Sequence, residues 1–214
     1  MAGTKVKTKV GNLKYVFITG EGRNNSMPGE EPRMQYVASM SVPKDGDVHK
    51  SFEALLDTEW NNYKAQYGVK GKPKTNGIKD ELMKDPNGEI DPETEEVRKI
   101  PTGNVLITFK TNTKWPDGNP QVVKVFDGKG NDITAAVHGA TWAIGDGSTG
   151  IIHGTAMGNN VGGTHKITLY LTAVQLATLS KYEGDTVETE EIGEELDLGE
   201  DAVAAIPKEE TPDL

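Results

Sequence analysis

The chain has 214 residues, of which 23 are Lys or Arg and 33 are Asp or Glu, so its net charge is −10. It contains no cysteine, which excludes a disulfide framework and a thiolate zinc site. No apolar run approaches the roughly 18 residues of a membrane span, and the first residues lack the long apolar segment of a signal peptide, so we expect a cytoplasmic protein without a membrane partner.

The charge is unevenly distributed along the chain. Residues 183–214 hold thirteen acidic residues and one lysine, whereas residues 1–182 hold 22 basic and 20 acidic residues. A second acidic run, residues 80–96, holds eight acidic residues and one lysine. A basic body with separate acidic blocks is typical of proteins that interact through charge, although an acidic tail can also serve only to keep a protein soluble.

The first half of the chain predicts two strands and a helix. Residues 13–20 and 33–43 alternate between apolar and polar side chains, the period of a β-strand, and a polar loop joins them. Apolar residues then recur at spacings of three and four, which predicts an amphipathic helix over residues 47–67 with Asp47 as its N-cap and Gly68 as its stop. Its Trp60 and Tyr63 are expected to pack in the core.

The second half begins with a basic connection, "VKGKPK", followed by the acidic residues 80–96, which we expect to form a loop. Strand patterns then return, joined by glycine turns, at residues 103–113, 120–127, 133–144, 151–158 and 165–179. One long helix among many strands predicts a mainly β fold, and an OB-fold-like five-stranded barrel with one inserted helix fits this order. We predict an OB-fold domain over residues 1–182 and a disordered acidic tail over residues 183–214.

Patterns typical of catalysis are missing from the sequence. The four histidines are scattered, the carboxylates lie in charge runs, and no glycine-rich loop ends in the Lys-Ser/Thr pair that cradles phosphates. We therefore expect no catalytic residue, no metal site and no cofactor.

Basic and aromatic residues alternate on several predicted strands. Single-stranded nucleic acid is bound by cations that track phosphates and by flat side chains on which bases stack. The candidates are Lys14, Tyr15, Lys70, Lys72, Lys74, Lys110, Lys114, Trp115, Lys124, Lys166 and Tyr170. Two questions stay open: whether Phe17, Phe109 and Phe126 belong to the core, and whether the three lysines of "VKGKPK" clamp phosphates or only solvate a linker.

The order of these parts resembles the single-stranded DNA-binding, or helix-destabilising, proteins of tailed bacteriophages. The resemblance lies in "LKYVFITG", "RMQYVASMSVP" before a helix, "ITFKTNT", "VVKVFDGKGNDI", "HKITLYLTAVQLATL" and the acidic tail. It implies an OB-fold that coats single-stranded DNA in replication, recombination and repair without catalysis. It also implies that Lys110 and "VKGKPK" contact the DNA backbone.

The resemblance further implies two roles for the tail. It would compete with DNA for the basic groove, and it would contact replication proteins such as a polymerase or a helicase-primase. The tail residues expected to dock on such a partner are Ile206, Asp213 and Leu214. Two features depart from the family: the chain ends in Leu214 where an aromatic residue is common, and residues 154–163, where a stacking ring is expected, offer only Met157.

A different class of protein also fits the sequence. A virion decoration or tail component built as a β-sandwich could carry the same acidic extension as a solvated segment. That alternative predicts a symmetric assembly without salt-sensitive affinity for DNA. The oligomeric state, including a homodimer, is left open by the sequence.

Overall fold

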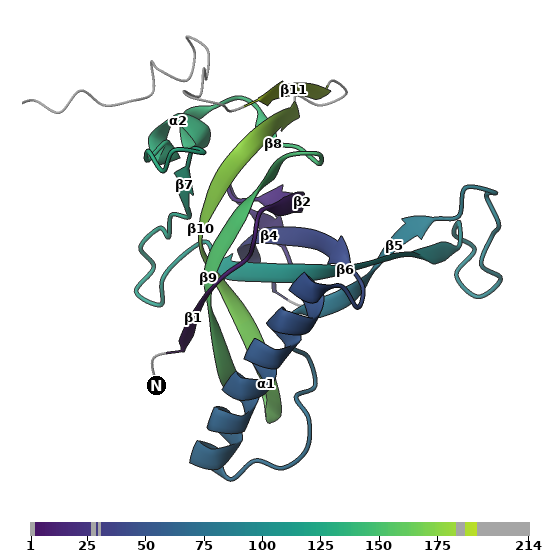
Figure 1. The fold of residues 1–214 in the computed structure, drawn as a ribbon, viewed down its shortest axis with the longest axis vertical. Helices are drawn as coiled ribbons and strands as arrows, with labels where there is room; N and C mark the ends of the chain where they lie inside the picture. Colours follow the sequence, from purple (N-terminus) through teal and green to yellow (C-terminus); the bar gives the residue numbers. More distant parts are fainter. Residues whose placement is uncertain (1–2, 27–28, 30, 183–186, 192–214) are drawn as a thin grey trace, which may run out of the picture.

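The computed structural model describes residues 3–26, 29, 31–182 and 187–191. Five strands pair in a closed circuit (Figure 1), in the order β2 (Gly11–Phe17), β4 (Met34–Pro43), β6 (Lys99–Asn112), β10 (Thr164–Tyr182) and β9 (Thr149–Val161), which returns to β2. The one long helix, α1 (Asp47–Tyr67), is inserted between β4 and β5 and packs against β9. The expectation of a mainly β fold with one long inserted helix is confirmed.

Short elements decorate this circuit. Strand β1 (Thr4–Lys7) pairs with β9, β3 (Arg23–Asn24) with β4, and β5 (Ile78–Lys84) with β6. Strand β10 is long enough to receive β7 (Lys124–Phe126), β8 (Ala143–Ile144) and β11 (Val187–Glu191) as well. A second helix, α2 (Thr134–Gly139), has only six residues.

The core lies inside the closed circuit and under α1. Alternate residues of the five strands are buried there, among them Leu13, Met40, Ile107, Phe109 and Leu169. The predicted core role of the two helix aromatics is confirmed. Trp60 stacks on Tyr63 with ring centres 5.4 Å apart, and its indole N–H donates to the carbonyl of Gly71.

Two glycines of β9 permit the close packing. A Cβ at Gly158 would lie 2.4 Å from the ring of Tyr63, and one at Gly154 would lie 2.3 Å from the carbonyl oxygen of Tyr170. Real Cβ atoms do not approach other atoms so closely, so α1 and β10 can lie this near to β9 only because these positions lack side chains.

The ends of α1 differ partly from the prediction. Gly68 closes the helix in the left-handed conformation, with φ of 68°, and its N–H donates to the carbonyl of Lys64, as expected. The prediction of Asp47 as N-cap is wrong, because Gly46 holds that position with extended backbone and no side chain caps the helix. Asp47 instead lies in the first turn, where its carboxylate is favoured by the helix dipole.

Two predicted strands are corrected. Residues 133–144 form α2 and the two-residue β8 rather than one strand, and Ala136 and Val137 of α2 are buried. Residues 120–127 form a strand only at Lys124–Phe126, which pairs in parallel with β10.

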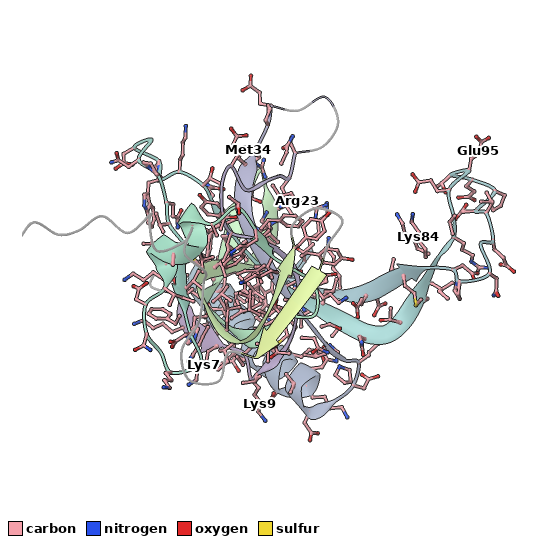
Figure 2. The ribbon with its side chains drawn as sticks, turned by 90° about the horizontal axis from the view of Figure 1, so that it is seen from above. Lys7, Lys9, Arg23, Met34, Lys84 and Glu95 are labelled. Atoms are coloured by element: carbon pink, nitrogen blue, oxygen red, sulfur yellow. The ribbon has the colours of Figure 1, made fainter. Side chains whose placement is uncertain are left out.

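The acidic residues 80–96 are not wholly a loop. Residues 80–84 belong to β5, which pairs with β6 up to Lys84 opposite Lys99. The hairpin projects from the body as an arm (Figure 1), and Lys84 and Glu95 lie on it, far from Lys7 (Figure 2). The acidic residues of its tip, around Glu95, are thereby kept away from the body, whereas Asp80 and Glu81 at its base contact Lys44 and Ser41.

Strand β11 continues the sheet beyond residue 182, where the sequence predicted the end of the folded part. It pairs in antiparallel register with the end of β10, from Tyr182 opposite Val187 to Thr178 opposite Glu191. The other tail residues, among them Ile206, Asp213 and Leu214, lie outside the described residues.

Candidate nucleic-acid interface

Among neighbouring strands of the closed circuit, β6 and β10 have the fewest paired residues. Only one residue pair joins these parallel strands, Lys110 opposite Tyr170. From Ala173 onward β10 pairs with β7 instead. Because the strands diverge on both sides of this pair, two hollows open next to each other on the outer surface, and both are lined by Thr111, Asn112, Lys114 and Tyr170.

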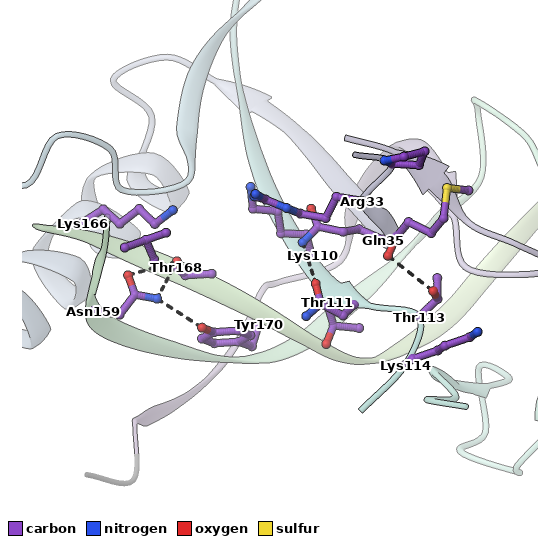
Figure 3. Close-up of a pocket in the computed structure, with 14 residues that line it drawn as sticks. Arg33, Gln35, Lys110, Thr111, Thr113, Lys114, Asn159, Lys166, Thr168 and Tyr170 are labelled. Atoms are coloured by element: carbon purple, nitrogen blue, oxygen red, sulfur yellow. Dashed lines mark hydrogen bonds between the residues drawn. The ribbon is translucent and has the colours of Figure 1, made fainter. Parts of the chain in front are cut away.

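The first of these, here called the cationic hollow, has a volume of about 520 Å³. Figure 3 shows Arg33 and Lys110 beside each other, with Lys166 towards one end and Lys114 towards the other. The remaining described lining residues are neutral: Pro32, Met34, Gln35, Thr111, Asn112, Thr113, Asn159, Val161, Thr168 and Tyr170. Four cations thus line this hollow, and no carboxylate is among its described lining residues.

The environment of Lys110 reflects this excess of positive charge. Burial lowers the pKa of the Lys110 ammonium, and the charges of Lys166, Lys79 and Arg33 lower it further. When the neighbours of a lysine are cations without a counter-charge, an anion that enters the hollow stabilises the charged form of that lysine. The cationic hollow is therefore suited to bind a multiply charged anion such as a phosphate chain.

Polar side chains fix the groups around Tyr170. The amide of Asn159 donates from Nδ2 to the hydroxyl of Tyr170 and to Oγ1 of Thr168, each at 3.1 Å. On the opposite wall, Nε2 of Gln35 donates to Oδ1 of Asn112 at 2.9 Å. The bond from Asn159 fixes the hydroxyl end of Tyr170 (Figure 3), a residue that lines both hollows.

The second, here called the aromatic hollow, has a volume of about 340 Å³ and is lined by Trp115, Pro116, Met157 and Tyr170 among others. Trp115 is 53% exposed. Its backbone is held by a tight turn, in which the N–H of Trp115 donates to the carbonyl of Asn119 at 2.8 Å. An exposed indole on a fixed turn and a phenol ring beside it offer flat surfaces on which bases can stack.

The sheet carries a further aromatic ring in line with Tyr170. Phe17, Val37, Lys110 and Tyr170 are successive cross-strand partners on β2, β4, β6 and β10. Phe17 is 41% exposed, and the guanidinium of Arg23 lies 5.5 Å from its ring centre. The sequence left the place of Phe17 open, and the structure puts it on the surface; Phe109 is buried in the core.

Five of the candidates chosen from the sequence meet at these two hollows: Lys110, Lys114, Trp115, Lys166 and Tyr170. The arrangement depends on strand pairing, since β6 and the turn that follows it bring the first three residues beside the last two on β10. That these cations and rings lie together is an observation of geometry. Their contact with DNA stays a prediction.

Three candidates lie elsewhere. Lys14 is 3.3 Å from Asp146, which also accepts the backbone N–H of Tyr15, a residue with φ of 51°. Lys124 is 3.5 Å from Asp132. These cations already face carboxylates, and none of the three residues lines either hollow.

The basic connection "VKGKPK" lies along the first residues of β10. The N–H of Lys74 donates to the carbonyl of His165, and Thr75 accepts from Ile167. Lys74 is therefore next to the end of the cationic hollow where Lys166 lies. Lys70 and Lys72 are exposed, and like Lys74 they line neither hollow.

The sequence analysis missed Arg33, Gln35 and Asn159, which line the cationic hollow, and Lys79, whose charge acts on Lys110. Arg33 and Gln35 lie on the polar side of the alternating segment 33–43, so their position opposite the apolar face was a usable signal. No local sequence pattern distinguishes Asn159 or Lys79. The pairing of β9 with β10 places Asn159 at the cationic hollow, and the pairing of β5 with β6 places Lys79 near Lys110.

Two other kinds of site were sought in the described part of the chain. No group of three or more His, Asp or Glu side chains there could hold a metal ion. None of the helices described is long and apolar enough to cross a membrane.

Known proteins resemble this chain in fold and not in sequence. No protein-family model and no curated sequence matches the chain. The crystal structure of gp2.5, a single-stranded DNA-binding protein encoded by bacteriophage T7, matches with a TM-score of 0.55 and 16% identity, over 89% of this chain and 100% of that one. The chain has the fold of the phage single-stranded DNA-binding proteins.

A second phage protein gives the same result. The single-stranded DNA-binding protein from bacteriophage Enc34 matches as a C-terminal truncation, with a TM-score of 0.52, 17% identity and coverage of 86% of this chain and 88% of that one. Its complex with single-stranded DNA matches with a TM-score of 0.51, 16% identity and coverage of 88% and 89%. At this identity the fold is shared while most side chains differ, so the residues of the interface are those of this chain and not those of the phage proteins.

Proposed function

We propose that the protein binds single-stranded DNA without sequence preference and without catalysis. The observation that carries this proposal is the pair of adjoining hollows, one with four cations and the other with exposed rings, and with no carboxylate among their described lining residues. A fold neighbour has been solved in complex with single-stranded DNA, which supports the same ligand here.

The chemistry of the two hollows suggests how the strand lies. Phosphates contact Arg33, Lys110 and Lys166 in the cationic hollow, and bases stack on Trp115 and Tyr170 in the aromatic hollow. Phosphate charge and the flat face of a base are common to all nucleotides. Binding through these two features is therefore tolerant of sequence.

The biological role that fits such binding is the coating and protection of single-stranded DNA in phage replication, recombination and repair, in the cytoplasm of the infected cell. The acidic tail supplies the second activity, contact with replication proteins such as a polymerase or a helicase-primase. This part of the proposal rests on the tail's charge and on the family resemblance described above.

A fluorescence titration with a labelled oligo-dT at two salt concentrations tests the proposal. We expect tight binding at low salt that weakens steeply at high salt, because each phosphate contact releases condensed counterions. A duplex of the same length should compete poorly. Absence of binding, or an affinity that salt does not change, would contradict the proposal and favour a structural role in the virion.

A further inference from the structure

A third hollow, of about 590 Å³, lies beside β1 and is here called the β1 hollow. Its lining residues are Lys5, Val6, Lys7, His153, Gly154, Thr155 and Thr172. Thr155 and Thr172 also line the aromatic hollow. The three hollows therefore follow one another across the outer surface, from Arg33 at one end to Lys7 at the other.

Strand β1 is firmly attached, so the backbone positions from which its side chains project are fixed. Val6 is buried against the core, and Oγ1 of Thr4 donates to the carboxylate of Glu59 at 2.7 Å. At the other end, Oγ1 of Thr8 accepts the N–H of Ile152 at 2.9 Å. Since side chains of a strand alternate between its faces, burial of Val6 and Thr8 turns Lys5 and Lys7 outward, about 6.8 Å apart along the strand.

The charge of this surface matches that of the cationic hollow. Both lysines are exposed, and no carboxylate is among the described residues that line the β1 hollow. Within the described part of the chain, neither lysine lies within ion-pair distance of an acidic side chain. Two cations held on a rigid strand, at a spacing similar to that of neighbouring phosphates in an extended strand, are suited to a DNA backbone.

We propose that the β1 hollow is a second phosphate-binding segment, which receives single-stranded DNA after it has passed Trp115 and Tyr170. This inference rests on the proposed function and deepens it, because it assigns a longer path and two further contact residues, Lys5 and Lys7. It also predicts that the binding site is longer than the two hollows between β6 and β10 provide. Lysines on an edge strand can alternatively serve only to prevent pairing with another chain.

The test compares two lengths of oligo-dT, about 6 and about 20 nucleotides, within and beyond the range that one OB-fold occupies. The variant is Lys5→Ala with Lys7→Ala, and the control is Lys9→Ala, an exposed lysine that lines none of the three hollows. We expect the double variant to bind the short oligonucleotide normally. On the long one it should bind more weakly, with the slope of log K against log salt reduced by about 1.4 for two lost contacts.

Other outcomes overturn the inference. Unchanged affinity and slope on the long oligonucleotide would show that the lysines do not contact DNA, and new aggregation in light scattering would then assign them to edge protection. An equal loss on the short oligonucleotide, or in the Lys9→Ala control, would show a general effect of charge or folding. If the unsubstituted protein binds neither length, the proposed function itself fails.

Discussion

Lys110 and Lys124 illustrate why residue type alone does not define a binding residue. Each lies on a strand close to aromatic residues, and both were chosen from the sequence for that reason. In the structure Lys124 faces Asp132, whereas Lys110 lies among cations that lower its pKa. Only a cation whose charge is not already compensated gains much from a phosphate, so Lys110 is the better candidate.

Removal of single cations tests this difference. Lys110→Ala and Lys166→Ala should each weaken binding to all single-stranded sequences alike and lower the salt slope by about 0.7, the value for one lost phosphate contact. Lys124→Ala should leave both quantities unchanged, because its ammonium lies outside the hollows. Titrations at several salt concentrations measure both; a loss of affinity with an unchanged slope would assign the residue to folding or packing.

The lowered pKa of Lys110 makes a separate prediction about pH. An unperturbed lysine has a pKa of 10.5, and Lys110 loses its proton at a lower pH than that. The affinity for DNA should therefore fall as pH rises through the lowered pKa of Lys110. In the same interval the unfolded chain binds more protons than the folded one, so this group makes folding more stable as pH rises. Lys110→Arg keeps its charge throughout and should shift the fall in affinity to higher pH. Identical pH profiles for the two proteins would contradict the assignment.

Stacking is tested at Trp115 and Tyr170. Trp115→Ala and Tyr170→Ala should each cost roughly 1–3 kcal/mol of single-strand affinity with little change in salt slope, because a stacked base is lost and no phosphate contact is. Tyr170→Phe keeps the ring and should retain most of the affinity. Because Trp115 is exposed, Trp115→Ala should leave the melting temperature unchanged. A stable Trp115→Ala variant that binds DNA normally would remove this residue from the site.

At the scale of elements, sequence periodicity predicted what local spacing determines. Residues 33–43 alternate and form β4 from Met34 to Pro43, and the three-four spacing of residues 47–67 forms α1. Residues 133–144 are a short apolar run without a clear period, so strand and helix could not be told apart, and the helix α2 forms there. Strand β11 was missed because an acidic segment becomes a strand only when the edge of β10 is available to pair with it.

The same limit applies to the candidate site. Lys110, Lys166 and Tyr170 were found because they stand on the polar side of strands, and Lys114 and Trp115 because they follow β6 directly. Whether Lys14 would meet a phosphate or Asp146 depends on a contact between residues 132 positions apart, which no local pattern encodes. The sequence therefore predicted the kinds of residue in the interface better than it predicted which of them meet.

The packing of α1 on β9 can be tested at Gly158. Gly158→Ala places a Cβ against the ring of Tyr63, so ring and helix must move, and overpacking of this kind typically costs 1–3 kcal/mol of folding stability. Asn160→Ala, on the same strand but exposed, is the matched control. Urea denaturation compares the two; equal midpoints would show that the helix adjusts without cost.

At the scale of the whole molecule, charge is divided between separate parts. The cations line the three hollows, while the acidic tip of the β5–β6 hairpin, around Glu95, projects away from the body (Figure 2). Residues 192–214 carry eight acidic residues and one lysine. Of these two acidic parts, the tip of the hairpin projects away from the body (Figure 2), so residues 192–214 are the better candidate to compete with DNA.

Truncation after Glu191 tests that competition. This cut keeps β11, whereas a cut after Tyr182 would remove a paired strand together with the acidic charge. A tethered tail acts at an effective concentration on the order of millimolar, so DNA must displace it, and truncation should tighten single-strand binding at low salt. The gain should shrink as salt rises, because charges are screened beyond a Debye length of about 8 Å at physiological ionic strength.

Two controls accompany the truncation. Folding stability should hardly change, since the buried core of the described residues lies between Val6 and Leu179, and thermal melting checks this. A variant in which the acidic residues of the tail are replaced by Asn and Gln should reproduce the tighter binding, because it removes the charge and keeps the length. Equal or weaker affinity in the folded truncated protein at low salt would contradict competition and leave the tail a role in solubility. Loss of binding to a replication partner in both variants would assign that contact to the same acidic residues.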